Sequence, residues 1–283
     1  MRSDAEDVNS FSMRVDRPWR RLLAAAALAA LPFATLPIGS AAGGNEAEVL
    51  LGGQSGIVTI EQSGNDNRIE VRQVGGWSGR VAARQSGTQN RAVVEQNGGS
   101  GNSAELVMNG ARNEAAVQQS GSRNQAHLEI AGEGNGAGTL EASLIQAGDD
   151  NRADIRSTGV ANSFRVAQFG DFNAASLTQD GVGNLATLMQ QGSANTATVM
   201  QSGALWAANS LLLVQEGTGN SSSLVQSGNA NNAEIVQRGN SNVSDAVQIG
   251  DGNYLRHVQI GNGLQHPTIV QTGGASVVIV QTN

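Results

Sequence analysis

The sequence lacks the residues on which several classes of protein depend. It contains no cysteine, which excludes a disulfide framework, thiol chemistry and a thiolate metal site. All 17 basic residues are arginine, and the net charge of -7 argues against nucleic acid as the main partner, because phosphate neutralisation requires a basic surface. Aromatic residues make up only 3% and charged residues 14%, so neither a conventional core of large side chains nor charge-driven disorder is expected.

In place of these residues, the chain repeats the phrase Gln-x-Gly-x-x-Asn-x-Ala-x-x-x-Gln about every eleven residues, and residues 190–201 are a clean copy. Thirteen of the nineteen intervals between successive Gln positions are eleven residues, and glycine stands two places after each of the first nineteen positions. A fixed period of this kind predicts a stacked repeat architecture. Seventeen of the twenty positions hold glutamine: Gln62, Gln73, Gln85, Gln96, Gln119, Gln146, Gln168, Gln179, Gln190, Gln201, Gln215, Gln226, Gln237, Gln248, Gln259, Gln271 and Gln281.

Each unit, read from its Asn position, predicts a seven-residue β-strand. In residues 231–237, one face shows Asn, Ala, Ile and Gln, and the other shows Asn, Glu and Val, which is the alternation of a half-buried strand. Four residues such as 63–66, which include a glycine, are expected to form the turn between strands. A glycine in every unit opposes a helix. The Asn positions taken as structural are Asn67, Asn90, Asn113, Asn124, Asn151, Asn162, Asn173, Asn184, Asn195, Asn220, Asn231, Asn242 and Asn253.

Two strand–turn units make one coil of about 22 residues, so the sequence predicts an all-β fold, a two-sheet β-solenoid of about ten stacked coils. Buried amides are costly alone, but stacking identical amides at a rise of about 4.8 Å lets each side chain donate to one neighbour and accept from the other. The Gln and Asn positions are therefore expected to form ladders. Met108, Ile130 and Ser157 replace Gln on consecutive rungs of one face, and two long intervals are interpreted as loop insertions at 133–139 and 203–208.

The first 42 residues predict a secretory signal peptide. Four arginines between Arg14 and Arg21 precede the apolar run 22–31, and the small residues 40–42 offer a cleavage site before Gly43. The apolar run is short for a membrane span. Met13 is a possible true start, because it would give a more typical signal length. The expected organisation is a signal peptide, 1–42, and a secreted repeat solenoid, 43–283.

No cluster of residues predicts catalysis or a bound metal. His127, His257 and His266 are scattered, so they are expected to be solvent-facing or stacked imidazoles and not ligands. A calcium-binding β-roll needs Asp at a fixed place in successive turns, where this chain has Asn. No pair of carboxylates has the local context of a glycosidase. We therefore expect no enzyme activity, no cofactor and no metal.

The spacing Gln-x-Gly-x-x-Asn-x-Ala-x-x-x-Gln resembles the curlin repeat of bacterial curli subunits, over roughly residues 47–281. The resemblance implies a subunit that is secreted across both membranes and polymerises into extracellular amyloid fibres of biofilm matrix. It also implies two partners besides the protein itself, a nucleator subunit and an outer-membrane secretion pore. Whether the chain is a major subunit or a nucleator is open.

Two classes of function remain after these exclusions. The first is a structural subunit whose open ends add further copies, because the uncharged, apolar segment 275–281 carries no blocking cap. The alternative is a monomeric surface adhesin or binding module that uses the flat outer faces, and an end-capping domain would favour it.

Ten of the twelve arginines after Gly43 lie at or before Arg165. Like charges are expected to stack there and delay assembly, whereas strands within the segment 184–226 are uncharged.

Overall fold

The computed structural model describes residues 10–13, 33–35, 43–138, 141–203 and 207–283, which form strands and the turns between them. The expected signal peptide lies outside these residues except for two short strands. Sheet A contains β1 (Ser10–Met13), β3 (Glu46–Gln54), β5 (Arg68–Trp77), β7 (Arg91–Asn97), β9 (Glu114–Ser120), β11 (Ala142–Ala147), β13 (Ser163–Phe169), β15 (Leu185–Ser193), β17 (Ser210–Thr218), β19 (Asn232–Arg238), β21 (Tyr254–Ile260) and β23 (Ser276–Thr282). Sheet B contains β2 (Phe33–Thr35), β4 (Ile57–Asn65), β6 (Arg80–Thr88), β8 (Ser103–Ala111), β10 (Gln125–Glu133), β12 (Arg152–Val160), β14 (Ala174–Val182), β16 (Thr196–Gly203), β18 (Ser221–Ser227), β20 (Val243–Ile249) and β22 (Ile269–Thr272).

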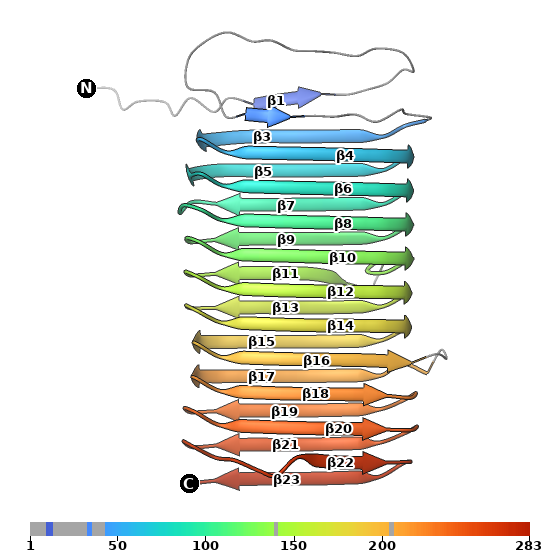
Figure 1. Cartoon of the computed structure of the whole chain (residues 1–283), viewed down its shortest axis with the longest axis vertical. Helices are drawn as coiled ribbons and strands as arrows, with labels where there is room; N and C mark the ends of the chain where they lie inside the picture. The colour runs from blue at the N-terminus through green and yellow to red at the C-terminus, as the bar shows by residue number, and fades with distance from the viewer. Residues whose placement is uncertain (1–9, 14–32, 36–42, 139–140, 204–206) are drawn as a thin grey trace, which may run out of the picture.

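Consecutive strands alternate between the two sheets, so the chain climbs as a β-solenoid from β3 to β23 (Figure 1). Neighbouring strands within each sheet are parallel and one coil apart in the sequence, as Gln168 and Gln190 are in β13 and β15. Among the described strands, only β1 pairs antiparallel, with β3. The predicted all-β, two-sheet solenoid of about ten coils is confirmed. Among the described residues, no helix has the length and apolarity needed to cross a membrane.

Alternation along each strand gives the solenoid its core. β19 buries Ala233, Ile235 and Gln237 and turns the side chains between them outward. The inward aliphatic side chains of the two sheets form one hydrophobic cluster along the solenoid, and burial of this apolar surface is the dominant favourable term in folding. Small side chains at the second inward position keep this layer thin. The alanines of the repeat at this position are all buried: Ala92, Ala104, Ala115, Ala126, Ala153, Ala175, Ala186, Ala197 and Ala233.

Many turns are shorter than the four residues expected from the sequence. β4 continues through Ser63, Gly64 and Asn65, so that only Asp66 and Asn67 separate it from β5. Gly64 has a φ of 94°, which lets the backbone bend while its hydrogen bonding to the next coil continues. The structural Asn lies immediately before the strand and is not its first residue.

The two loop insertions are also displaced from their expected bounds. β10 runs to Glu133, and the buried Asn135 stacks between Asn113 and Asn162, so the first insertion lies between Asn135 and Ala142 and does not occupy 133–139. β16 includes Gly203, and the second insertion ends before Asn209. An asparagine of the ladder sets each of these boundaries: Asn135 directly before the first insertion and Asn209 directly after the second.

Charges on the outer faces mostly meet opposite charges in the neighbouring coils, which contradicts the expected stacking of like charges. On sheet B, Arg84 lies 3.1 Å from Glu61 and 3.4 Å from Glu105, and a similar pair of 3.2 Å joins Arg156 to Glu129. These side chains are exposed, so each pair contributes about 0–1 kcal/mol to stability. The argument that charge delays assembly of the early coils therefore loses its basis.

Candidate assembly interface

Sheet A carries an unbroken ladder of glutamine side chains on its inner face. The Nε2 of each Gln donates to the Oε1 of the Gln in the next coil at 2.7–2.9 Å, from Gln73 to Gln281. Nε2 also donates across the core, as that of Gln190 does to the carbonyl oxygen of Ala174 in β14 at 2.9 Å. The ladder thus satisfies buried amides and ties the two sheets together. Its members are Gln73, Gln96, Gln119, Gln146, Gln168, Gln190, Gln215, Gln237, Gln259 and Gln281.

The corresponding ladder of sheet B is interrupted. Gln62 donates to Gln85 at 3.0 Å, and Gln85 then faces the sulfur of Met108 at 3.7 Å. Met108, Ile130 and Ser157 occupy the next three rungs and are fully buried, as their parity in the sequence indicates. The amide ladder resumes at 2.8–3.0 Å through Gln179, Gln201, Gln226, Gln248 and Gln271.

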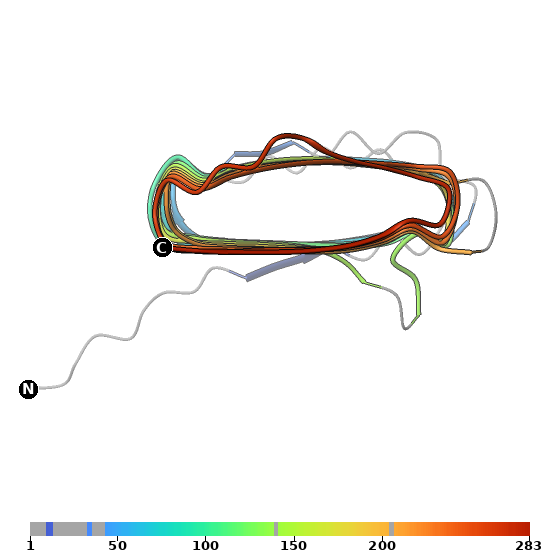
Figure 2. The ribbon, with the colours of Figure 1, turned by 90° about the horizontal axis from the view of Figure 1, so that it is seen from below.

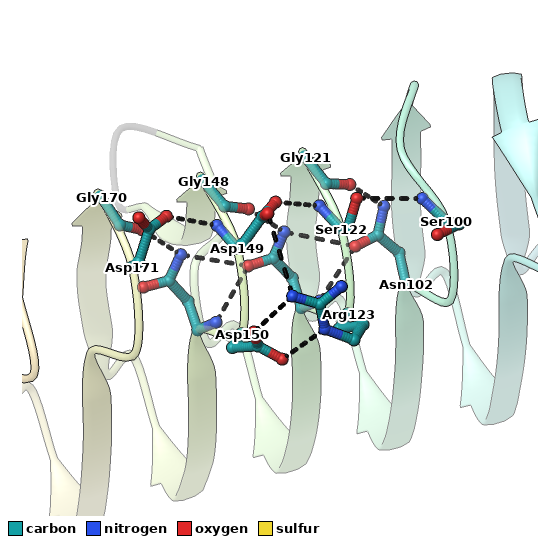
Figure 3. A network of polar contacts seen from close by, with 12 residues as sticks. Ser100, Asn102, Gly121, Ser122, Arg123, Gly148, Asp149, Asp150, Gly170 and Asp171 are labelled. Atoms are coloured by element: carbon teal, nitrogen blue, oxygen red, sulfur yellow. Dashed lines mark hydrogen bonds and ion pairs between the residues drawn. The ribbon is translucent and has the colours of Figure 1, made fainter.

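Asparagine side chains form two further ladders, each where a turn leads into a strand. The Oδ1 of Asn195 accepts both the backbone N–H and the Nδ2 of Asn220, at 3.1 and 3.0 Å, and its own Nδ2 lies 2.9 Å from the carbonyl oxygen of Gly217. Figure 3 shows the same arrangement around Asn102, whose Nδ2 donates to the carbonyl oxygen of Gly121. The first Asn column contains Asn45, Asn67, Asn90, Asn113, Asn135, Asn162, Asn184, Asn209, Asn231 and Asn253. The second Asn column contains Asn102, Asn124, Asn151, Asn173, Asn195, Asn220 and Asn242.

Four members of these columns were not among the structural positions taken from the sequence: Asn45, Asn102, Asn135 and Asn209. Counting backwards from the next Gln position, and not forwards from the previous one, would have found Asn102 and Asn209. Asn102 stands six residues before Met108, just as Asn67 stands six before Gln73. Asn135 stands five residues after Ile130, just as Asn67 stands five after Gln62, so counting forwards would have found it in spite of the insertion that follows.

The amide ladders of the two residue types run in opposite directions. Between side chains, Gln Nε2 donates to the Gln on the C-terminal side, as from Gln190 to Gln215, whereas Asn Nδ2 donates to the Asn on the N-terminal side, as from Asn195 to Asn173. The C-terminal end therefore presents one amide hydrogen of Gln281, and the N-terminal end of the repeat presents the Oε1 of Gln62. The two ends are complementary.

Turn residues add a polar network on one edge of the solenoid (Figure 3). The Oδ1 of Asp149 accepts the backbone N–H of Ser122 at 2.7 Å, and the Oδ1 of Asp171 accepts that of Asp149 at 2.8 Å. The Arg123 guanidinium donates to both carboxylate oxygens of Asp150, which lowers the pKa of that carboxyl. Within the part of the chain that the structure describes, no three His, Cys, Asp or Glu residues are placed to hold a metal ion.

His257 is a titratable group inside the core, whereas His127 is half-exposed on the outer face. It stands in β21 where β19 has Ile235 and β23 has Ile279. Its Nδ1 lies 2.7 Å from the Oγ of Ser244, and its Nε2 lies 3.3 Å from the Oε1 of Gln281. The pKa of His257 is lowered, mainly because burial disfavours the charged ring, and the nearby His266 ring lowers it further.

We expect the solenoid to lose stability as the pH falls from about 8 to about 5. Below the ordinary histidine pKa of 6.5, the unfolded chain binds a proton that the folded chain resists, and the loss continues down to the lowered folded pKa. The thermal midpoint across this range measures the effect. His257→Ile should flatten the profile, and His127→Gln should leave it unchanged. A profile that survives His257→Ile would contradict the assignment.

The two ends of the solenoid present different surfaces. At the C-terminal end, β22 and β23 are the last strands of their sheets, and the inward Val277 and Ile279 are only partly buried. On the outer face of β23, Val278 and Val280 are 59% and 57% exposed. At the N-terminal end, β1 pairs with β3, and β2 pairs with β4. Both covering strands belong to the expected signal peptide.

A family model for the curlin associated repeat matches residues 170–203. The chain therefore contains a curlin-associated repeat. The matched segment contains β14, β15 and β16, and the same Gln and Asn ladders continue through most of the coils on both sides of it. The resemblance of the spacing to curlin repeats is thereby confirmed. No curated protein matches the sequence significantly.

Proposed function

We propose that this curlin-repeat protein is a secreted structural subunit that polymerises into extracellular, curli-like amyloid fibres of a biofilm matrix. The observation that carries the proposal is the C-terminal end, where two strand edges and the partly buried Val277 and Ile279 lie open. An open strand edge presents rows of backbone N–H and C=O groups that template the next chain. Each added copy extends both sheets and covers the exposed end of the core.

The role is structural and not catalytic, and the partner is another copy of the same chain. Among the described residues, all buried side-chain N and O atoms except Gln73 Oε1 and Ser222 Oγ have hydrogen-bond partners. The inner Gln and Asn side chains bond to one another and to the backbone. The family resemblance adds a nucleator subunit and an outer-membrane secretion pore as proposed partners, and fibres on the cell surface as the proposed location.

Removal of residues 1–42 is proposed as the step that prepares the N-terminal end. β1 and β2 occupy the edges of β3 and β4, so a chain that keeps them cannot accept another subunit there. A chain that begins at Gly43 keeps β3–β23 and exposes both edges. We therefore expect the processed chain to elongate at both ends and the unprocessed chain at one.

The purified chain from Gly43 onward should assemble with a lag that added seeds shorten, followed by thioflavin fluorescence. Oriented fibres should give a reflection at about 4.7–4.8 Å, the strand spacing along the axis. The chain with residues 1–42 retained should elongate more slowly from the same seeds. A persistent monomer with no such reflection would contradict the proposal and favour the monomeric adhesin.

Two neighbouring variants separate growth at the C-terminal end from folding. Ile279→Lys places a charge on the inner face of the last coil, where a following copy would bury it, and should abolish elongation there. Val278→Lys places the same charge on the outer face one residue away, where it stays solvated. Equal growth of the two variants would show that the inner face of β23 is not part of the contact.

A further inference from the structure

The number of strands in the solenoid constrains how two subunits join. Sheet A contributes eleven strands from β3 to β23, and sheet B contributes ten from β4 to β22, so one subunit spans ten and a half coils. We propose that consecutive subunits in the fibre are related by a half-turn about its axis, so that sheet A of one subunit continues as sheet B of the next. This inference rests on the proposed polymerisation and adds its geometry.

A junction without the half-turn leaves one strand position of sheet B empty. The strands of the two sheets are staggered, each strand of sheet B lying between two strands of sheet A along the axis (Figure 1). Stacking β3 of the next copy on β23 would put its β4 two strand spacings from β22. The facing edges of β22 and β4 would then keep their backbone groups unpaired, at a cost for each buried group. After a half-turn, β3 lies on β22 and β4 lies on β23, and both sheets are continuous.

The shape of the coil allows this operation. Each strand–turn unit passes into the next by crossing from one sheet to the other, so a half-turn per unit is already the internal symmetry of the solenoid. Figure 2, seen from the C-terminal end, shows two flat sides of similar length joined by two rounded edges. Twenty-one units amount to an odd number of half-turns, and the junction continues the same operation.

The side chains that the half-turn brings together are matched. The inward residues of β23 are Val277, Ile279 and Gln281, and those of β4 are Val58, Ile60 and Gln62. Valine thus stacks on valine, isoleucine on isoleucine and glutamine on glutamine.

The two glutamines also have the correct polarity. Gln281 gives one amide hydrogen to the carbonyl oxygen of Gln265, so its second can reach the Oε1 of Gln62 in the next copy. Without the half-turn, Gln281 would face Leu51 of β3.

The phase of the repeat is also preserved across the junction. For a subunit of residues 43–283, Leu51 of the next copy follows Gln281 by eleven residues, which is the commonest interval within the chain. Gly43 and Gly44 then fill the two turn positions between Asn283 and Asn45. Both glycines already have positive φ, 77° and 56°, and Gly43 accepts a hydrogen bond from the N–H of Asp66 in the next turn.

The second contact of the junction, β3 on β22, leaves no glutamine amide hydrogen unpaired. The Nε2 of Gln271 donates to the carbonyl oxygens of Tyr254 and Ala275 at 2.7 and 3.0 Å, so it needs no glutamine beyond it. Leu51 of the next copy would cover it. Successive subunits would advance by about 50 Å at the usual strand spacing.

Engineered cysteines test the geometry, since the chain has none of its own. The half-turn places Thr59 of the next copy beside Val278 of the preceding copy, whereas direct stacking places Glu48 of the next copy beside Val278. All three side chains point outward, so the core is unchanged. Thr59→Cys/Val278→Cys fibres should give disulfide-linked multimers on non-reducing gels, and Glu48→Cys/Val278→Cys fibres should give monomers. Arg256→Cys/Val278→Cys, which are register partners within one chain, control for the ability of neighbouring strands to cross-link.

Multimers from the Glu48 pair, or fibres of the Thr59 pair without multimers, would overturn the half-turn. Both results require that fibres form, so they leave the proposed function intact. Absence of fibres from the unsubstituted chain would instead refute the proposed function itself. Image reconstruction of fibres gives an independent reading: a rotation near 180° per subunit, beyond the twist of the sheets, supports the junction, and one near zero contradicts it.

Discussion

Replacement of Gly159 by alanine is expected to destabilise the solenoid by about 3 kcal/mol or more. Gly159 has a φ of 114°, a conformation in which a side chain is strained, and an added Cβ would overlap the backbone oxygen of Gly181 in the next coil. The same contact recurs from Gly132 to Gly159, so the glycines of successive turns approach one another along the axis. The shift of the chemical denaturation midpoint of the monomer measures the loss.

Gly263→Asn provides the matched control. Gly263 also has a positive φ, 64°, but no atom lies within 4 Å of its added Cβ, and asparagine tolerates this left-handed region. Its effect should stay below about 1 kcal/mol. Comparable losses for both variants would mean that backbone strain alone, and not the close stacking of turns, accounts for the glycines.

The stacking direction and inward faces of the solenoid could be predicted because one rule generates them. Period-two alternation determines which side chains point inward, and a constant spacing of about 22 residues determines which of them stack. Gln168 and Gln190 could be paired from the sequence for this reason. The interruption at Met108, Ile130 and Ser157 followed from the same count, since each lies one coil from the next.

The details that could not be predicted depend on local geometry within the repeat. The sequence does not show that the backbone bends at Gly64 while β4 continues to Asn65, because this depends on how the neighbouring turn stacks on it. Asn135 was missed because the sequence interpretation placed it inside the first insertion, although it keeps the motif's spacing of five residues from Ile130. The ion pair of Arg84 with Glu61 was missed for another reason: each stands one place before a ladder glutamine, Gln85 or Gln62, but like charges and not opposite ones were expected to stack. His257 was expected to be a solvent-facing or stacked imidazole; it is buried at an inward position where the neighbouring coils have isoleucine, and its ring contacts that of His266.

Among single substitutions at ladder positions, Asn195→Ala should lower the stability of the solenoid more than Gln190→Ala, and Ser157→Ala should lower it least. The Oδ1 of Asn195 accepts the backbone N–H of Asn220, so its loss leaves a buried main-chain donor without a partner as well as side-chain groups. Several unpaired groups at about 1–3 kcal/mol each predict a loss of about 3–5 kcal/mol. Chemical denaturation of the monomers and the rate of seeded assembly both measure it.

The other two substitutions remove progressively less. Gln190→Ala interrupts the ladder between Gln168 and Gln215 and one bond across the core, all of them made by side-chain amides, and should cost about 2 kcal/mol. Ser157 makes only a 3.4 Å contact with Gln179, in a stretch that already lacks amides, so Ser157→Ala should be nearly neutral. If Gln190→Ala proved as costly as Asn195→Ala, the side-chain ladder and not the capping of backbone N–H groups would determine stability. If Ser157→Ala cost as much stability as the other two substitutions, neither the Gln nor the Asn ladder would determine stability. The aliphatic core would then account for it.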